Sequence, residues 1–148
     1  MKILILTLSI AFLCGNAVAE ERSCTKAEAM EAESSVSRLN NWEDVYKSFK
    51  KFRFCDDGAI AEGYSDVVER MLSNQWGQLE ELVKLSSSDK GYIVFVVKHI
   101  DATADKSDVE NIIVNSSTKC PESAKSVCSE IEKSAREALK EIQKYSKP

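Results

Sequence analysis

The chain has few of the residues that interrupt helices or build metal sites. Its 148 residues include five glycines and two prolines, one of which is the terminal Pro148. Histidine occurs once, as His99, and no two cysteines form a Cys-x-x-Cys motif, so the common zinc patterns are excluded. No Gly-x-Ser-x-Gly motif marks a nucleophilic serine either. We therefore expect a largely helical protein with no metal or other cofactor.

The one long apolar run lies at the N-terminus. Lys2 precedes apolar and small residues from Ile3 to Gly15, and the small-x-small pattern Ala17-Val18-Ala19 follows. The run is shorter than the roughly 18 residues that a membrane-spanning helix needs, which favours a cleaved signal peptide. We expect residues 1–19 to be the signal peptide and residues 20–148 a single domain, periplasmic or secreted, without membrane insertion after cleavage.

The charge balance is acidic, with 24 Asp and Glu against 20 Lys and Arg and a formal net charge of −4. Loss of Lys2 with the signal peptide makes the mature chain one unit more negative. A net negative charge argues against nucleic acid and anionic membranes as partners. It favours a basic protein partner.

Four cysteines remain after the signal peptide and its Cys14 are removed, namely Cys24, Cys55, Cys120 and Cys128. An even number in an exported chain predicts two disulfides, and three pairings are possible. If Cys120 begins the same helix as Cys128, eight residues of helix separate the two by roughly 12 Å, beyond disulfide reach. A Cys120–Cys128 bond therefore requires Cys120 to fold back before the helix starts.

Apolar residues recur at helical spacing along most of the chain and predict an all-α, single-domain bundle of about seven helices in paired hairpins, stapled by disulfides. Thr25, with Glu28 three residues on, predicts a capping box at the start of a first, mostly polar surface helix. The later apolar stripes begin at Trp42, Ile60 and Trp76.

The second half of the chain contains one ambiguous segment. Residues 92–100, "YIVFVVKHI", suit a strand or a buried helix, and the helix is favoured because no second strand candidate exists to pair with it. Residues 86–91 and 101–108 are expected to be loops, with Ser107 capping the next helix. Pro121 is expected to open the longest helix.

The stretch "FRFCDDGAIAEGYSDVV" places a cysteine before two carboxylates and a glycine-rich helix start. Asp56 is the expected N-cap, with Asp57 in the first turn. Gly58 and Gly63 destabilise a helix, which suggests that another helix approaches closely. The alternative is that Asp56, Asp57 and Glu62 form a reactive or binding cluster, since paired carboxylates can divide acid and base roles.

His99 is the other candidate. With Asp101 it could act as a base and its orienting carboxylate, or it could join Asp56 or Asp57 at a metal. The alternative is a partly buried histidine with a structural hydrogen bond.

The segment "FCDDGAIAEGYSDVVERML" resembles the cysteine-then-small-residue helix, with its Gly-Tyr pair, of small periplasmic all-helical immunity proteins that neutralise peptidoglycan-amidase effectors of type VI secretion. The resemblance extends to the signal peptide, mature size and helical content. It implies a homodimer-forming helical fold that inserts a loop or helix into the active-site groove of a toxin.

The leading hypothesis is a non-enzymatic exported protein that binds another protein, such as a secreted toxin or effector, as an immunity or inhibitor protein. Rigid placement of carboxylates suits such recognition. The alternative is a periplasmic hydrolase, acting on cell wall or dependent on a metal, that uses an Asp/Glu/His cluster. The candidate binding residues are Asp56, Asp57, Glu62, His99, Asp101 and Asp105, and a hydrolase would use the first four of them.

Overall fold

The computed structural model describes residues 22–145, so the expected signal peptide lies outside the described residues. This range forms seven α-helices and no strand, which confirms the all-α prediction. The α-helices are α1 (Lys26–Val36), α2 (Trp42–Phe52), α3 (Gly58–Asn74), α4 (Leu79–Ser88), α5 (Lys90–Lys98), α6 (Lys106–Thr118) and α7 (Lys125–Tyr145). Three short 3₁₀ turns, η1 (Arg53–Cys55), η2 (Trp76–Gln78) and η3 (Glu122–Ala124), connect some of them.

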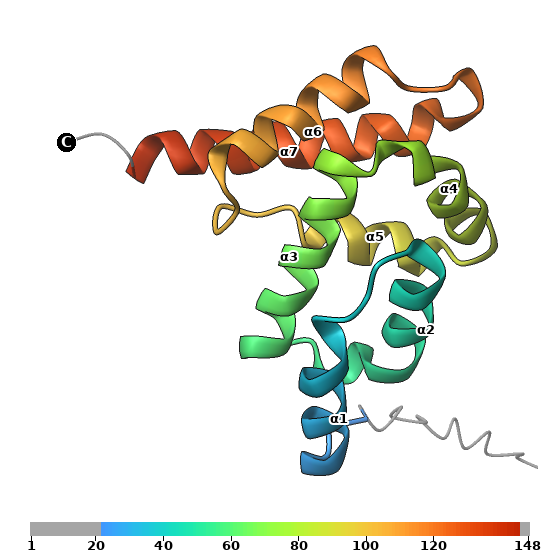
Figure 1. Cartoon of the computed structure of the whole chain (residues 1–148), viewed down its shortest axis with the longest axis vertical. Helices are drawn as coiled ribbons and strands as arrows, with labels where there is room; N and C mark the ends of the chain where they lie inside the picture. The colour runs from blue at the N-terminus through green and yellow to red at the C-terminus, as the bar shows by residue number, and fades with distance from the viewer. Residues whose placement is uncertain (1–21, 146–148) are drawn as a thin grey trace, which may run out of the picture.

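The helices form two groups joined by α3. Helices α6 and α7 pack together as a long hairpin along the top of Figure 1, and α3 runs away from this hairpin towards α1 and α2. Helices α4 and α5 fill the space beside α3, with α4 against α2 and α5 against α7. One end of α3 therefore contacts the C-terminal hairpin, and the other contacts the N-terminal helices.

Helix α1 begins as predicted, because the Thr25 side chain accepts the Glu28 backbone N–H and the Glu28 carboxylate accepts the Thr25 N–H at 3.0 Å. The helix lies on the surface as expected, with Ala32 and Val36 as its two buried residues. Val36 contacts α3 at Gly63, where the missing side chain allows the two backbones to approach closely. The absence of a side chain at Gly63 on α3 therefore leaves room for the buried Val36 of α1.

The core between α2, α3 and α5 is aromatic. The ring of Phe95 lies with its centroid 4.9 Å from that of Phe49 and 5.0 Å from that of Tyr64. The two buried phenols keep hydrogen-bond partners: Tyr64 bonds the Ser48 hydroxyl at 2.7 Å, and Tyr92 donates to the Trp42 carbonyl at 2.9 Å. Such satisfied polar tips allow tyrosines to fill a core without an unpaired hydroxyl.

The predicted loop at 86–91 is wrong. Helix α4 continues to Ser88, and Asp89 alone separates it from α5, which begins at Lys90. The Asp89 carboxylate accepts the Gly91 N–H at 3.0 Å and so caps α5 directly after α4 ends. The ambiguous segment, residues 92–100, lies mostly in α5, which confirms the prediction of a helix rather than a strand.

The next loop is shorter than predicted, because α6 begins at Lys106 and Asp105, not Ser107, is its N-cap. The Asp105 carboxylate accepts the Ser107 backbone N–H at 2.8 Å and also the Ser107 hydroxyl. Aspartate and serine are both favoured N-cap residues, and the negative charge of the Asp105 carboxylate additionally suits the helix N-terminus.

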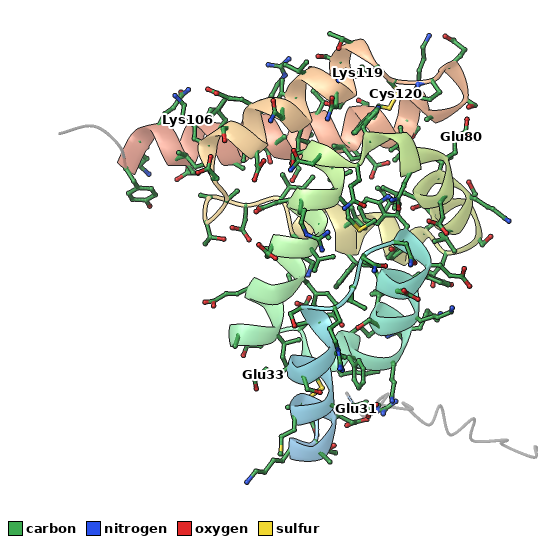
Figure 2. All side chains as sticks on the ribbon, viewed as in Figure 1. Glu31, Glu33, Glu80, Lys106, Lys119 and Cys120 are labelled. Carbon is green, nitrogen blue, oxygen red and sulfur yellow. A yellow bond between two sulfur atoms is a disulfide. The ribbon has the colours of Figure 1, made fainter. Side chains whose placement is uncertain are left out.

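Two disulfides join Cys24 to Cys55 and Cys120 to Cys128. Cys120 lies in the turn between α6 and α7 (Figure 2), ahead of the helix that carries Cys128, and their Cα atoms are 6.2 Å apart. The expectation that Pro121 opens the longest helix is therefore wrong: a 3₁₀ turn follows Pro121 and α7 begins at Lys125. This turn brings Cys120 back over the start of α7.

Two disulfides in a small domain are typical of proteins that fold outside the cytoplasm. Among the helices of residues 22–145, none combines the length and the apolar character that crossing a membrane requires.

Candidate functional site

The two adjacent aspartates at the start of α3 have different roles. Asp57, not Asp56, is the N-cap, and its carboxylate accepts the Gly58 N–H at 2.8 Å. Gly58 has φ +51°, a left-handed conformation that glycine adopts without strain. The predicted cap at Asp56 is wrong because the turn at Gly58 places the cap one residue later and directs Asp56 into the protein.

Asp56 contacts His99 and Lys98 at the end of α5. Its Oδ1 lies 3.2 Å from His99 Nε2, and its Oδ2 accepts from Lys98 Nζ at 2.7 Å. Only 8% of the Asp56 side chain and 2% of the His99 side chain are exposed. Burial by itself raises the pKa of the Asp56 carboxyl, but the bonds to His99 and Lys98 outweigh it and lower the pKa below its ordinary value.

The other ring nitrogen of His99, Nδ1, contacts Ser65 on α3. His99 Nδ1 lies 3.2 Å from Ser65 Oγ, and Ser65 Oγ donates to Asp101 Oδ2 at 3.0 Å. Asp101 Oδ1 accepts both the backbone N–H and the hydroxyl of Thr103, at 2.7 and 2.6 Å. Four side chains from three separate segments thus form one line, Asp56–His99–Ser65–Asp101, which we call the buried polar line.

The hydrogen bonds of the buried polar line define its donors. Burial opposes ionisation of Asp101, but the Thr103 and Ser65 bonds lower the pKa of this carboxyl below its ordinary value. An ionised carboxylate only accepts, so the single hydroxyl proton of Ser65 goes to Asp101. Ser65 Oγ is then left to accept from His99 Nδ1, whereas Asp56 Oδ1 and His99 Nε2, although 3.2 Å apart, are both buried without a well-aligned hydrogen-bond partner in the described residues.

Aromatic rings enclose His99 on its remaining sides. The imidazole centroid lies 4.5 Å from that of Phe95 and 5.5 Å from that of Tyr64. In the described part of the chain, no group of three or more His, Cys, Asp or Glu side chains is placed to hold a metal ion. The interpretation of His99 as a buried, hydrogen-bonded residue therefore fits its surroundings.

Ser65, the third member of the line, borders a surface hollow of about 480 Å³ between α3 and the start of α6. We call this hollow the acidic depression. Its lining residues are Glu62, Ser65, Asp66, Glu69, Arg70, Asn74, Thr103, Ala104, Asp105 and Asp108.

Glu69 is the most enclosed carboxylate of the acidic depression, with 7% of the residue exposed. Its Oε1 accepts the backbone N–H of Asp101 at 3.4 Å. Burial, and then the neighbouring charges of Asp101, Asp108 and Asp66, raise the pKa of Glu69 to about 8 against the single opposing N–H bond. The acidic depression thus contains a carboxyl that its surroundings keep largely protonated at neutral pH.

The acidic depression lacks countercharge. Five of its ten lining residues are acidic and one, Arg70, is basic. Within residues 22–145 none of the five carboxylates forms an ion pair, and Arg70 donates instead to the Leu39 carbonyl at 2.8 Å. Elsewhere on the surface several acids are paired with lysine or arginine, for example Glu43 with Lys47.

The six candidate residues separate into three groups. Asp56, His99 and Asp101 belong to the buried polar line, whereas Glu62 and Asp105 lie on the exposed walls of the acidic depression. Asp57 lies apart from both and caps α3.

Sequence reasoning missed Ser65 and Glu69. They lie one turn apart on α3, among apolar core positions, and both are buried. Polar side chains inside an apolar helical stripe are the signal that would have identified them, because burying such groups requires a partner.

No family model, curated protein or solved structure matches this chain.

Proposed function

We propose that the chain is a non-enzymatic exported protein that binds a basic surface of another protein through the acidic depression. The observation that carries the proposal is the group of four acidic side chains that, together with the largely protonated Glu69, form no ion pair in the described range. Clustered like charges raise the local concentration of an oppositely charged partner and accelerate association.

The compartment proposed is the periplasm or the extracellular space, supported by two disulfides and by the signal peptide expected at residues 1–19. The partner proposed is a secreted effector that degrades the cell wall, for which this chain would be the immunity or inhibitor protein. The segment 101–108 supports this partner, because it forms one wall of the acidic depression and presents Asp105 at the start of α6. A homodimer remains a prediction from the family resemblance.

Affinity capture from envelope extracts tests the proposed function. The mature chain, residues 20–148, is immobilised beside an Asp66→Asn/Asp108→Asn variant that removes two charges from the acidic depression. A matched Glu80→Gln/Glu130→Gln variant removes two exposed charges from α4 and α7, neither of which forms an ion pair in the described range.

We expect a basic protein to be recovered by the wild type and the matched variant, and to be lost from the Asp66→Asn/Asp108→Asn variant at physiological salt. Capture should weaken as salt is raised, because screening shortens the reach of surface charges. Equal recovery by all three proteins would contradict binding through the acidic depression. Recovery of no protein, with a monomer in light scattering, would contradict protein binding altogether.

A specific observation also supports the second candidate, a periplasmic hydrolase. Asp56, His99 and Ser65 lie in line with separations of 3.2 Å, and Ser65 borders the acidic depression. Carboxylate, imidazole and hydroxyl in this order are the groups of serine acyl transfer. The Ser65 hydroxyl, however, donates to Asp101 rather than to His99, and the residue is 4% exposed.

Turnover of peptidoglycan fragments and of an activated ester distinguishes the two functions. A hydrolase would show turnover that disappears in a folded Ser65→Ala variant and persists in Asp57→Asn, because Asp57 lies outside the buried polar line. The proposed binding function instead predicts no turnover by the wild type.

A further inference from the structure

Glu69 differs from the other carboxylates of the acidic depression in its burial. It lies on α3 one turn after Ser65 and is 7% exposed, whereas Glu62, Asp66 and Asp105 are exposed. A buried carboxyl normally has several hydrogen-bond donors or a cation beside it, because burial without them is costly.

Glu69 has only one such donor in the described range, the backbone N–H of Asp101, at the long distance of 3.4 Å to Oε1. Among residues 22–145 no donor bonds Oε2, although Glu69 lines the acidic depression. Arg70, the one cation in the lining, forms no ion pair with it and donates to the Leu39 carbonyl. One oxygen of a nearly enclosed carboxyl is therefore free to accept from a ligand.

We propose that Glu69 forms the floor of a subsite that takes one basic side chain, the guanidinium of arginine or the ammonium of lysine, from the partner protein. This inference rests on the proposed function and specifies the chemical group that the acidic depression recognises.

The distribution of ligand atoms favours an organic cation over a bare metal ion. In the described residues no three His, Cys, Asp or Glu side chains are close enough together to hold a metal ion. The volume of about 480 Å³ falls in the range of ligand pockets, roughly 300–1,000 Å³, and leaves room for a side chain rather than a single ion. A guanidinium carries several donors in a fixed plane and can reach separated oxygens at once.

The charged groups around Glu69 are unbalanced. Asp66 lies on α3 with Glu69, Asp101 on the loop between α5 and α6, and Asp108 on α6. All three raise the pKa of Glu69. Arg70 is the basic group in the lining. A bound cation would offset this repulsion and the burial of Glu69, and so would favour the ionised carboxylate.

Binding should therefore release a proton. The pKa of Glu69 near 8 means that the free protein holds this proton at pH 7 and loses it by pH 9. A ligand that prefers the ionised form then binds about tenfold more tightly at pH 9 than at pH 7. Arginine stays charged over this range, so the change arises from the protein.

The test is isothermal titration of the mature chain with Nα-acetyl-arginine amide, with the uncharged citrulline analogue as the control ligand. Titrations at pH 7 in two buffers of different ionisation enthalpy count the protons released. We expect close to one proton released per arginine bound, tighter binding at pH 9, and no binding of the citrulline analogue. Binding without proton release, or equal binding of the two ligands, would overturn the inference.

Glu69→Gln is the matched variant, since it keeps the size of the side chain and removes the titrating group. It should abolish both the proton release and the pH dependence, whereas Glu80→Gln should leave both unchanged. The wild-type proton count tests the same inference without any variant, should Glu69→Gln fail to fold.

The two proposals fail separately. If a protein is captured in a way that depends on Asp66 and Asp108, but arginine neither binds nor releases a proton, the subsite is wrong and the proposed function stands. If arginine binds with proton release and no protein is captured, the proposed function is wrong and the subsite stands.

Discussion

Gly63 on α3 lies against Val36 on α1 so closely that a Cβ atom added to the glycine would sit 2.5 Å from Val36 Cγ1. Real Cβ atoms do not approach another carbon to this distance. Val36 is β-branched and 4% exposed, so its side chain has one preferred rotamer and little space to move. The contact fixes where α1 crosses α3. It also explains why α3 contains a glycine at this position although glycine destabilises a helix.

Gly63→Ala should therefore destabilise the protein. Overpacking costs about 1–3 kcal/mol, with the 2.5 Å contact favouring the upper part of that range. The better helix propensity of alanine returns about 1 kcal/mol, so we expect a net loss of up to about 2 kcal/mol in urea unfolding. Gly77→Ala is the control, because a Cβ there meets nothing within 4 Å. Recovery of stability in Gly63→Ala/Val36→Ala would confirm the contact, and no loss in the single variant would contradict it.

Asp56→Asn should destabilise the protein at neutral pH by about 1–3 kcal/mol, because it leaves the buried His99 without its carboxylate. The lowered pKa of Asp56 means that its contribution is present above the unfolded value of 3.8 and is lost as pH falls below it. The difference between wild type and variant should shrink accordingly in unfolding curves taken from pH 7 down to pH 3.

Asp57→Asn is the matched control for that experiment. The substitution is the same, one residue along the chain, but Asp57 is exposed and asparagine also serves as an N-cap. A loss in Asp57→Asn as large as that in Asp56→Asn would show that the contacts of Asp56 with His99 and Lys98 do not account for the effect.

Glu69→Gln should have a pH-dependent effect of the opposite sign. With a folded pKa of about 8 and an ordinary value of 4.5, the folded state holds a proton that the unfolded state has lost, so stability falls as pH rises through this interval. The slope approaches about 1.4 kcal/mol per pH unit. The variant should therefore gain on the wild type from pH 5 to pH 8 in thermal unfolding, and parallel profiles would refute the raised pKa.

The two disulfides should differ in their contribution to stability. Their cysteines are separated by 31 and 8 residues, and loop-closure entropy assigns the longer loop about 4 kcal/mol and the shorter about 2.5 kcal/mol. Non-reducing peptide mapping should find Cys24 linked to Cys55 and Cys120 to Cys128, with no free thiol. Paired Cys→Ala variants then compare the two contributions, and a larger loss from the Cys120–Cys128 pair would contradict the entropic ranking.

Much of the fold could be predicted because local spacing determines it. The capping box at Thr25 and the aromatic stripe of α2 follow from i, i+3 and i, i+4 patterns, and residues 22–145 show both. The turns were harder: Asp89 alone was enough to separate two helices where a six-residue loop was expected. Asp89 caps α5 without any further loop residue, and the composition of residues 86–91 does not predict so short a connection.

The candidate site could be predicted only in part, because it depends on how distant segments meet. Asp56, His99 and Asp101 stood out as polar residues beside apolar stripes, but their connection runs through Ser65, which lies 34 positions from His99. The choice of Asp57 over Asp56 as the cap depends on the left-handed turn at Gly58, a backbone angle that neighbouring aspartates do not reveal.

The four cysteines of the described chain are bonded in sequence order, the first pair as Cys24–Cys55 and the second as Cys120–Cys128. A chain that crosses a membrane N-terminus first presents its thiols to an oxidase in this same order. In a chain exported in this way Cys24 and Cys55 emerge before Cys120 and Cys128, so oxidation in order of appearance would yield the observed bonds. Maturation of this protein should accordingly need an oxidase but no isomerase to reshuffle mispaired thiols.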